Sequence, residues 1–148
     1  MTIFELLHIT DYLDIKHIGY FSTMDSVKKA IQLIRKQPGF NRFPHNFFTI
    51  PREVVPPIKD PGYIYEAGIS FHDREYVVEG GEILGVFGQE ADAENSISLF
   101  CQNNTTITGQ WLLVDSDFGR CELDKSWWTE GFDSVSIQKE EGLCNDTL

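Results

Sequence analysis

The stretch Ile18-Gly19-Tyr20-Phe21 recurs 66 positions later as Leu84-Gly85-Val86-Phe87. The strand patterns before these two stretches match at an offset of 61, where Phe4-Glu5 meets Tyr65-Glu66. The difference of five residues belongs to a longer hairpin connection in the second copy. A strand glycine that recurs in the same surroundings indicates an internal duplication.

A helical apolar stripe follows each copy of the glycine strand and stays in register with it. In the first copy the stripe has spacing i, i+3, i+4, i+7 and consists of Val27, Ala30, Ile31 and Ile34. In the second copy the predicted helix covers residues 89–102, with one face formed by Ala93, Ile97, Phe100 and Cys101. Ser22-Thr23-Met24-Asp25 is a typical helix start, because a hydroxyl can accept from free amides and an acid complements the helix dipole.

Each copy therefore predicts the order strand, strand, helix, strand. Apolar runs predict strands over residues 3–9, 15–21 and 47–50, and again over 63–71, 82–87, 110–114 and 120–123. One such unit is too small to bury much apolar surface alone, so we expect two copies to pack together. The predicted fold is α+β: two tandem β-β-α-β units with a mainly antiparallel sheet, one helix per unit and a pseudo-twofold relationship.

The prolines of residues 51–62 predict a linker, because proline cannot donate to a strand ladder. We therefore expect a first unit at 1–50, a Pro-rich linker at 51–62 and a second unit with a C-terminal strand and Trp segment at 63–138. A polar tail should follow at 139–148, and the whole should form one compact domain.

Charge divides the chain unevenly. The net charge is −11, yet residues 1–60 hold eight basic and six acidic residues, and residues 61–148 hold four basic and seventeen acidic ones. The second half thus carries all the excess negative charge. Such a surface repels nucleic acid and anionic membranes and favours a basic partner, although plain solubility would explain it as well.

Neither a membrane span nor a signal peptide is predicted. No run approaches the ~20 apolar residues that a span needs, and Met1–Leu7 contains no basic residue. We therefore expect a cytoplasmic protein. The odd number and wide spacing of the cysteines argue against a disulfide framework; Cys101 is expected as a buried thiol and Cys144 as an exposed free one.

The histidines and glycines predict neither a metal site nor a cofactor. His8 and His17 lie on adjacent predicted strands and could meet, but a satisfied or solvent-facing pair explains them better than a metal site. Asp115-Ser116-Asp117 offers oxygen ligands, yet nothing nearby completes a calcium loop, so a turn is favoured. The glycines at 80, 81 and 85 follow the wrong order of elements for a dinucleotide fingerprint.

The first unit resembles a small bacterial domain of unknown function. The resemblance lies in Ile15–Ser22, the helix and Gln37-Pro38-Gly39-Phe40, and in the ending Leu123–Phe132, which contains Trp127-Trp128-Thr129-Glu130-Gly131. It covers residues 1–50 and 120–134, and the middle segment is extra. Proteins of this kind are similar to immunity proteins of bacterial contact-dependent growth inhibition systems. The resemblance implies a partner, the cognate toxin's C-terminal domain, and implies no catalytic residues.

Acidic residues of the second unit are the predicted partner-binding site. They lie on the hairpin connection, at the start of the second helix and before the last strands, where they could occupy a cationic cleft; local helix stabilisation and a solvated face are the simpler explanation. Trp127 and Trp128 are candidate interface anchors, or core residues, and at least one should be core. The predicted acids are Asp73, Glu75, Glu79, Glu82, Glu90, Asp92, Glu94, Asp115 and Asp117.

The sequence thus predicts a binding protein, and not an enzyme, that neutralises a basic toxin domain such as a nuclease. A small-ligand regulatory module is the alternative, because repeated β-α-β units often bind metabolites where they meet. An enzyme using Cys121 or His72 is a third possibility. Neither nucleic acid nor membrane is an expected partner, and exposed strand edges leave a homodimer open.

Overall fold

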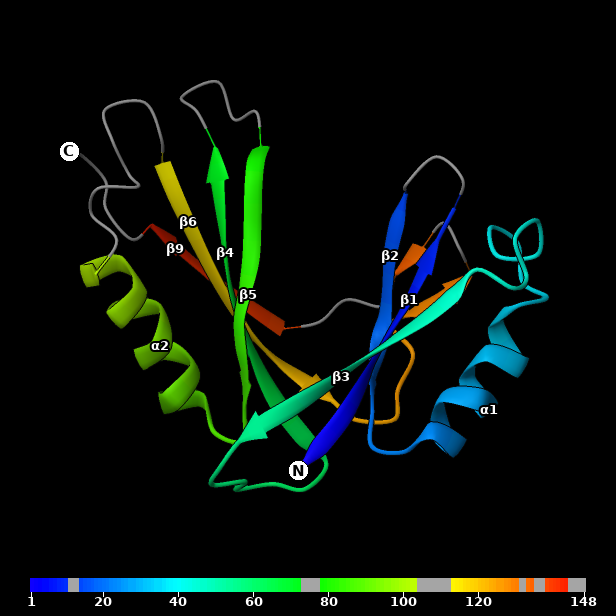
Figure 1. The fold of residues 1–148 in the computed structure, drawn as a ribbon, viewed down its shortest axis with the longest axis horizontal. Helices are drawn as coiled ribbons and strands as arrows, with labels where there is room; N and C mark the ends of the chain where they lie inside the picture. The colour runs from blue at the N-terminus through cyan, green and yellow to red at the C-terminus, as the bar shows by residue number, and fades with distance from the viewer. Residues whose placement is uncertain (11–13, 73–77, 104–112, 131–132, 135–137, 144–148) are drawn as a thin grey trace. The chain divides into compact units, whose positions relative to one another are not determined.

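A computed structural model of the chain describes residues 1–10, 14–72, 78–103, 113–130, 133–134 and 138–143. The first four elements are β1 (Thr2–Ile9), β2 (Ile15–Phe21), α1 (Met24–Ile34) and β3 (Phe47–Val55). The next four are β4 (Tyr63–His72), β5 (Val78–Phe87), α2 (Glu90–Asn103) and β6 (Leu113–Glu122), followed by β7 (Trp128–Glu130), β8 (Asp133–Ser134) and β9 (Gln138–Leu143). The order β-β-α-β occurs twice (Figure 1), which confirms the predicted α+β fold of two repeated units.

The chain forms two compact units. Unit 1 contains Met1–Glu53 and Cys121–Ile137, and unit 2 contains Val54–Arg120 and Gln138–Leu148. The Trp segment expected in the second unit therefore belongs to the first. Residues 51–55, expected in the linker, are the second half of β3.

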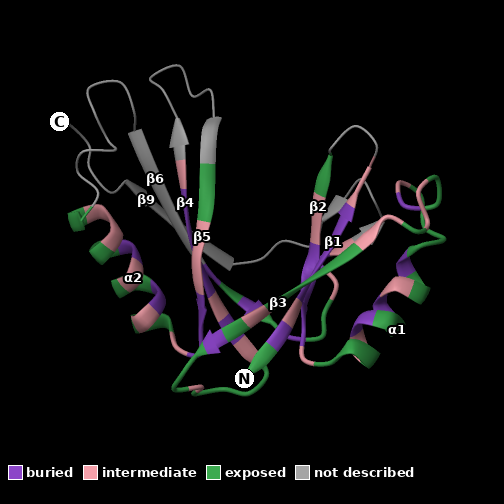
Figure 2. Cartoon of the chain, viewed as in Figure 1, coloured by how far each residue is buried: buried purple, intermediate pink, exposed green. Residues whose placement is uncertain are grey.

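Unit 1 is built on an antiparallel sheet with the order β2-β1-β3. Helix α1 begins where predicted, because the side chain of Thr23 accepts a hydrogen bond from Ser26 N at 3.1 Å. Buried and exposed residues alternate around this helix (Figure 2). Its apolar stripe packs into a core with Leu6, Ile18, Phe21, Val27, Ala30, Ile34 and Phe40.

Unit 2 repeats this plan with different neighbours. Strands β4 and β5 form an antiparallel hairpin, and the end of β3 pairs in parallel with β5 through Val54 and Val86. Ala93 and Ile97 of α2 pack on Ala67 and Phe87. Residues 139–143, expected in a polar tail, form β9, which pairs antiparallel with β6.

The duplication extends to an irregularity in the sheets. In unit 1 the register of β1 against β2 shifts between Leu6 and Leu7, and in unit 2 the register of β4 against β5 shifts between Ala67 and Gly68. These positions are equivalent at the offset of 61. A bulge re-aims the side chains that follow it, so the two hairpins share their local geometry as well as their order.

Within the described ranges, neither helix combines the length and the apolar character that crossing a membrane requires.

Candidate functional site

The charge asymmetry follows the boundary between the two units. Unit 1 holds eight basic and nine acidic residues, a net charge of −1, whereas unit 2 holds four basic and fourteen acidic residues, a net charge of −10. The predicted acidic surface is therefore a property of one structural unit.

The start of α2 carries the best-defined part of this surface. Glu90 and Glu94 are exposed and four residues apart, so they lie on one side of the helix. Asp92 is half-buried and accepts a hydrogen bond from Gln89 Nε2 at 2.7 Å. Glu82 of β5 is also exposed. All three helix acids lie where negative charge stabilises a helix N-terminus, so they serve the fold whether or not a partner binds.

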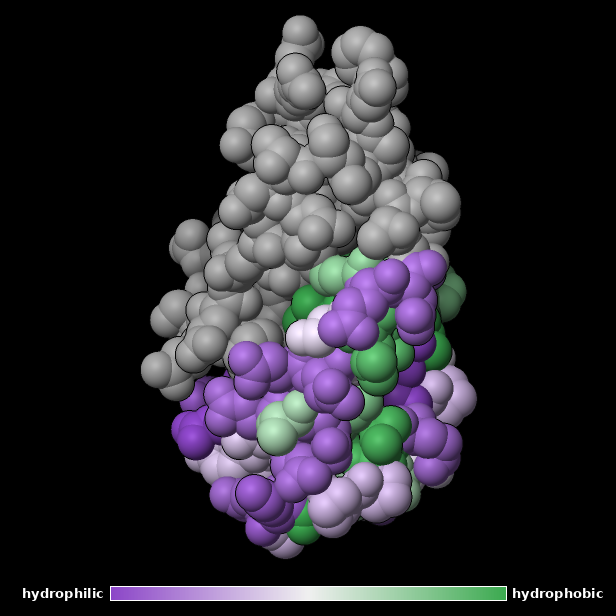
Figure 3. Space-filling view, turned by 90° about the vertical axis from the view of Figure 1, so that its left-hand side faces the viewer, coloured by the Kyte–Doolittle hydropathy of each residue, from purple (hydrophilic) through white to green (hydrophobic). Residues whose placement is uncertain are grey.

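The remaining predicted acids are less defined. Asp73 and Glu75 lie outside the described residues. Glu79, Asp115 and Asp117 belong to β5 and β6, and the structure describes only their backbone. Viewed from the side where α2 lies (Figure 3), the described surface is largely hydrophilic, with apolar side chains between the polar ones.

The two tryptophans belong to unit 1 and are not part of the acidic surface. Trp127 is buried and meets the Tyr20 ring edge-on, with the centroids 5.8 Å apart. Trp128 is half-buried beside the core and meets Phe40 edge-on at 6.4 Å. The prediction that at least one tryptophan is core is confirmed, and Trp127 offers no exposed ring as an interface anchor.

The segment around Asp124 joins the C-terminal part of unit 1 to β2. Asp124 N donates to Tyr20 O at 2.9 Å, and Trp127 N donates to Ile18 O at 2.7 Å. The Asp124 carboxylate in turn accepts from Ser22 N at 2.9 Å and Ser22 Oγ at 2.6 Å. Because these bonds cover the edge of β2, they explain why residues 121–137 fold with the first 53.

A buried carboxylate lies at the centre of the unit 1 sheet, and sequence reasoning missed it. Glu5 of β1 is 1% exposed. Its Oε1 lies 3.0 Å from His17 Nδ1, and its Oε2 accepts from Arg52 Nη2 at 2.7 Å and Arg52 Nε at 2.8 Å. Each of the three strands thus supplies one residue. The available signal was an acid inside an otherwise apolar strand, since buried acids need charged partners.

This cluster keeps Glu5 ionised. Burial alone would raise the pKa of Glu5, but the hydrogen bonds from His17 and Arg52 outweigh it and hold the pKa below its ordinary value. The His17 ring also stacks on Trp127, with the centroids 6.5 Å apart. A carboxylate that fixes a partly exposed histidine can orient it for proton transfer, yet no nucleophile is shown beside it, so we assign the cluster to structure.

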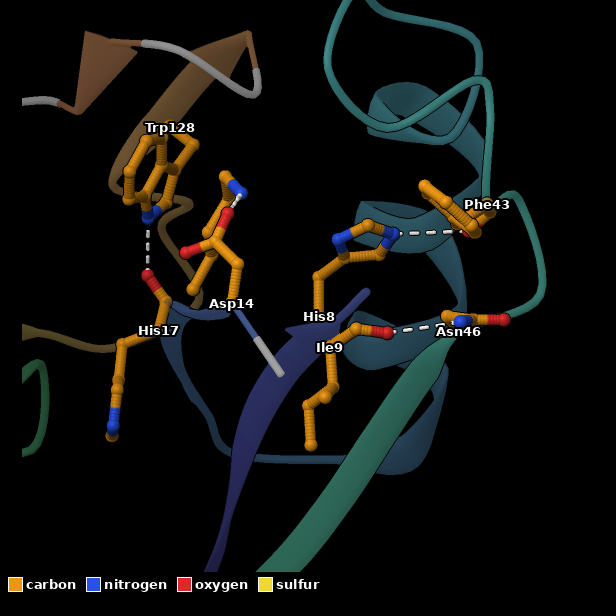
Figure 4. Close-up of polar contacts among 8 residues, drawn as sticks. His8, Ile9, Asp14, His17, Phe43, Asn46 and Trp128 are labelled. Atoms are coloured by element: carbon orange, nitrogen blue, oxygen red, sulfur yellow. Dashed lines mark hydrogen bonds and ion pairs between the residues drawn. The ribbon is translucent and has the colours of Figure 1, made fainter. Parts of the chain in front are cut away.

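His8 and His17 do not meet. His17 pairs with Leu7 in the sheet, and His8 pairs with Lys16. The His8 ring points to the 40–47 segment, where Nε2 donates to Phe43 O at 2.9 Å, whereas the Trp128 indole donates to the His17 carbonyl (Figure 4). Burial lowers the pKa of His8, because its Nδ1 is buried without a hydrogen-bond partner.

The cysteines differ from expectation. Cys101 is disulfide-bonded, so the prediction of a buried free thiol was wrong; its partner lies outside the described residues, as does Cys144. Cys121 is a free and fully buried thiol, a position that keeps it from substrates. Among the described side chains, no group of three or more acids, histidines and cysteines could hold a metal ion.

Comparison of the chain with models of known protein families, with curated proteins and with solved structures finds no match. The fold and the charges of the described residues therefore carry the functional argument.

Proposed function

We propose that this chain is an immunity protein that binds and neutralises a cognate bacterial toxin domain, a basic nuclease, through the acidic surface of unit 2. The observation that carries the proposal is the net charge of −10 on unit 2 against −1 on unit 1. A nuclease binds a polyanion, so its cleft is basic, and a strongly acidic inhibitor gains association rate and specificity against it.

The organisation of unit 1 supports the resemblance on which the toxin partner rests. The resemblance covers residues 1–50 and 120–134, and unit 1 contains 1–53 and 121–137. Two segments far apart in the sequence thus form one body, held together by Asp124 and its neighbours on β2. A nuclease acts on nucleic acid inside the cell, so the complex would form in the cytoplasm.

The test uses the toxin C-terminal domain encoded beside this gene and a charge-reversed variant. Glu90→Lys/Glu94→Lys should weaken binding in titration calorimetry at least about tenfold, because like charges would face each other. It should also fail to rescue cells that express the toxin. Glu53→Lys/Glu122→Lys is the matched control, since both residues are exposed in unit 1 and the change in net charge is the same.

Two results would contradict the proposal: no complex with the neighbouring toxin domain, or equal loss of binding in the control variant. A thermal-shift screen against amino acids and nucleotides addresses the small-ligand alternative. A clear shift with one of these compounds would favour the regulatory module.

A further inference from the structure

Helices α1 and α2 occupy equivalent positions in the repeat but carry opposite charge. Residues 24–36, which comprise α1 and the two residues after it, have a net charge of +3; α2 has a net charge of −3 and no basic residue. The basic residues of the α1 segment are Lys28, Lys29, Arg35 and Lys36, and all four are exposed.

Each helix also exposes a leucine at the same position of the repeat. Leu33 of α1 is 72% exposed and Leu99 of α2 is 48% exposed, and they are separated by the repeat offset of 66. A single exposed leucine needs no explanation. An exposed leucine in both copies, on faces whose charges are opposite, describes two surfaces that complement each other.

The neighbours of each leucine reinforce this complementarity. Lys29 precedes Leu33 by four residues and Lys36 follows it by three, so both lysines lie on the leucine's side of α1. On α2, Asn95 precedes Leu99 by four residues and the exposed Glu94 lies beside Asn95. One face is thus apolar with basic neighbours, and the other is apolar with neutral and acidic ones.

We infer that the α1 face of one copy of this protein binds the α2 face of a second copy, with Leu33 against Leu99 and lysines near glutamates. Two chains of net charge −11 repel each other. A contact of the +3 segment with the −3 helix opposes that repulsion locally, whereas α2 against α2 would add to it. The inference concerns the chain alone and stands or falls independently of any toxin.

The contact joins two different surfaces, so each copy has one of each to offer. If both contacts form between the same two copies, the product is a closed dimer. Because the attraction is between exposed charges, it should weaken as salt is added.

The first measurement is sedimentation equilibrium of the full chain at low and high salt. We expect reversible self-association at about 20 mM NaCl and a dissociation constant at least about tenfold weaker at about 500 mM, where the Debye length is a few ångström. A chain that is monomeric at low salt and high micromolar concentration would overturn the inference.

A charge-swap pair provides the decisive test. Lys28→Glu/Lys29→Glu makes both helices acidic, and Glu90→Lys/Glu94→Lys makes both basic, so each variant alone should be monomeric. Mixed in equal amounts, they should associate, because an acidic α1 then meets a basic α2 and the reverse. Recovery on mixing also shows that both variants are folded.

Two controls separate the contact from general charge effects. Arg42→Glu/Lys59→Glu, two exposed basic residues outside the helices, gives the same net charge as the lysine variant and should self-associate as the wild type does. Leu33→Ser should weaken association at least about tenfold at all salt concentrations. A mixture that stays monomeric, or a helix variant that associates as the wild type does, would contradict the inference.

Discussion

Unit 1 and unit 2 share an order of elements and a bulge, but they stabilise that frame differently. At the bulge, unit 1 opposes Leu6 with Gly19, and unit 2 opposes Ala67 with Gly85. Beyond the bulge, unit 1 has His17 where unit 2 has Ile83, and His8 where unit 2 has Ile69. The comparison teaches that the duplicated backbone tolerates polar anchoring in one copy and apolar packing in the other.

The surfaces have diverged further than the interiors. The apolar positions of the two helices are retained as Val27 and Ala93, and as Ile31 and Ile97. The outer faces are basic in one copy and acidic in the other. Such divergence is expected after duplication, because the stripe must bury apolar surface in both copies, whereas outer residues are constrained only by what they bind.

The equivalent glycines should give the largest difference between the copies. Gly19 has φ +155°, and a Cβ there would overlap the carbonyl oxygen of Lys125. At Gly85 a Cβ would instead meet the movable Phe87 ring at 2.9 Å. We expect Gly19→Ala to lower the free energy of unfolding by about 3 kcal/mol or more and Gly85→Ala by about 1 kcal/mol. Urea denaturation of both variants measures this, and equal losses would refute the assigned difference.

The disulfide at Cys101 belongs to unit 2 alone, since Arg35 occupies the equivalent position in unit 1. Cys101→Ser should therefore lower the free energy of unfolding by about 2–4 kcal/mol under oxidising conditions. Dithiothreitol should cause the same loss in the wild type and none in the variant. A wild type indifferent to dithiothreitol would show that the bond does not contribute in solution.

Much of the fold was predictable from the sequence because it depends on local pattern. The helix after Thr23, the strands over 3–9 and 15–21 and the duplication itself follow from periodicity and capping. Unit membership was not predictable, since it depends on hydrogen bonds between Asp124 and Ser22, 102 residues apart in the chain. Strand β9 was missed because Gln138–Leu143 is polar, and its pairing with β6 comes from the tertiary structure.

The candidate site was predictable only in part. Charge counting located the acidic surface in the second copy, because net charge does not depend on the fold. The Glu5 cluster depends on which strands become neighbours: β2 and β3 flank β1, and this brings His17 and Arg52 to one carboxylate. Sequence alone gave Arg52 no visible partner and placed it in a linker.

Removal of the Glu5 charge should affect unit 1 moderately. Glu5→Gln leaves Arg52 without its ionic partner, but the Arg52 and His17 side chains are 33% and 40% exposed and can recruit water. We therefore expect a loss of about 2 kcal/mol, below the 3–5 kcal/mol typical of a fully buried broken pair. Glu5→Gln/Arg52→Gln should recover part of the loss, and urea denaturation would show a failure to do so as two additive effects.

The smallest predicted effect is a pH dependence contributed by His8. Because burial lowers its pKa from the ordinary value of 6.5, the unfolded chain takes up the proton first as the pH falls. Stability should therefore decline below about pH 6.5, by at most about 1.4 kcal/mol per pH unit from this residue. Glu5 and Asp124, whose pKa values are lowered as well, add a further loss of stability only in more acidic solution.

His8→Gln isolates this term, because an amide can still donate to Phe43 O but does not titrate. Urea denaturation between pH 7 and pH 5 should then give a flatter profile than the wild type, while the decline below about pH 4.5 persists through Glu5. Unit 2 places the buried Ile69 where unit 1 has His8, so the difference between the two profiles is assigned to unit 1. An unchanged slope in His8→Gln would mean that His8 is protonated at the same pH in the folded and unfolded chain, despite its burial between Phe40 and Phe47.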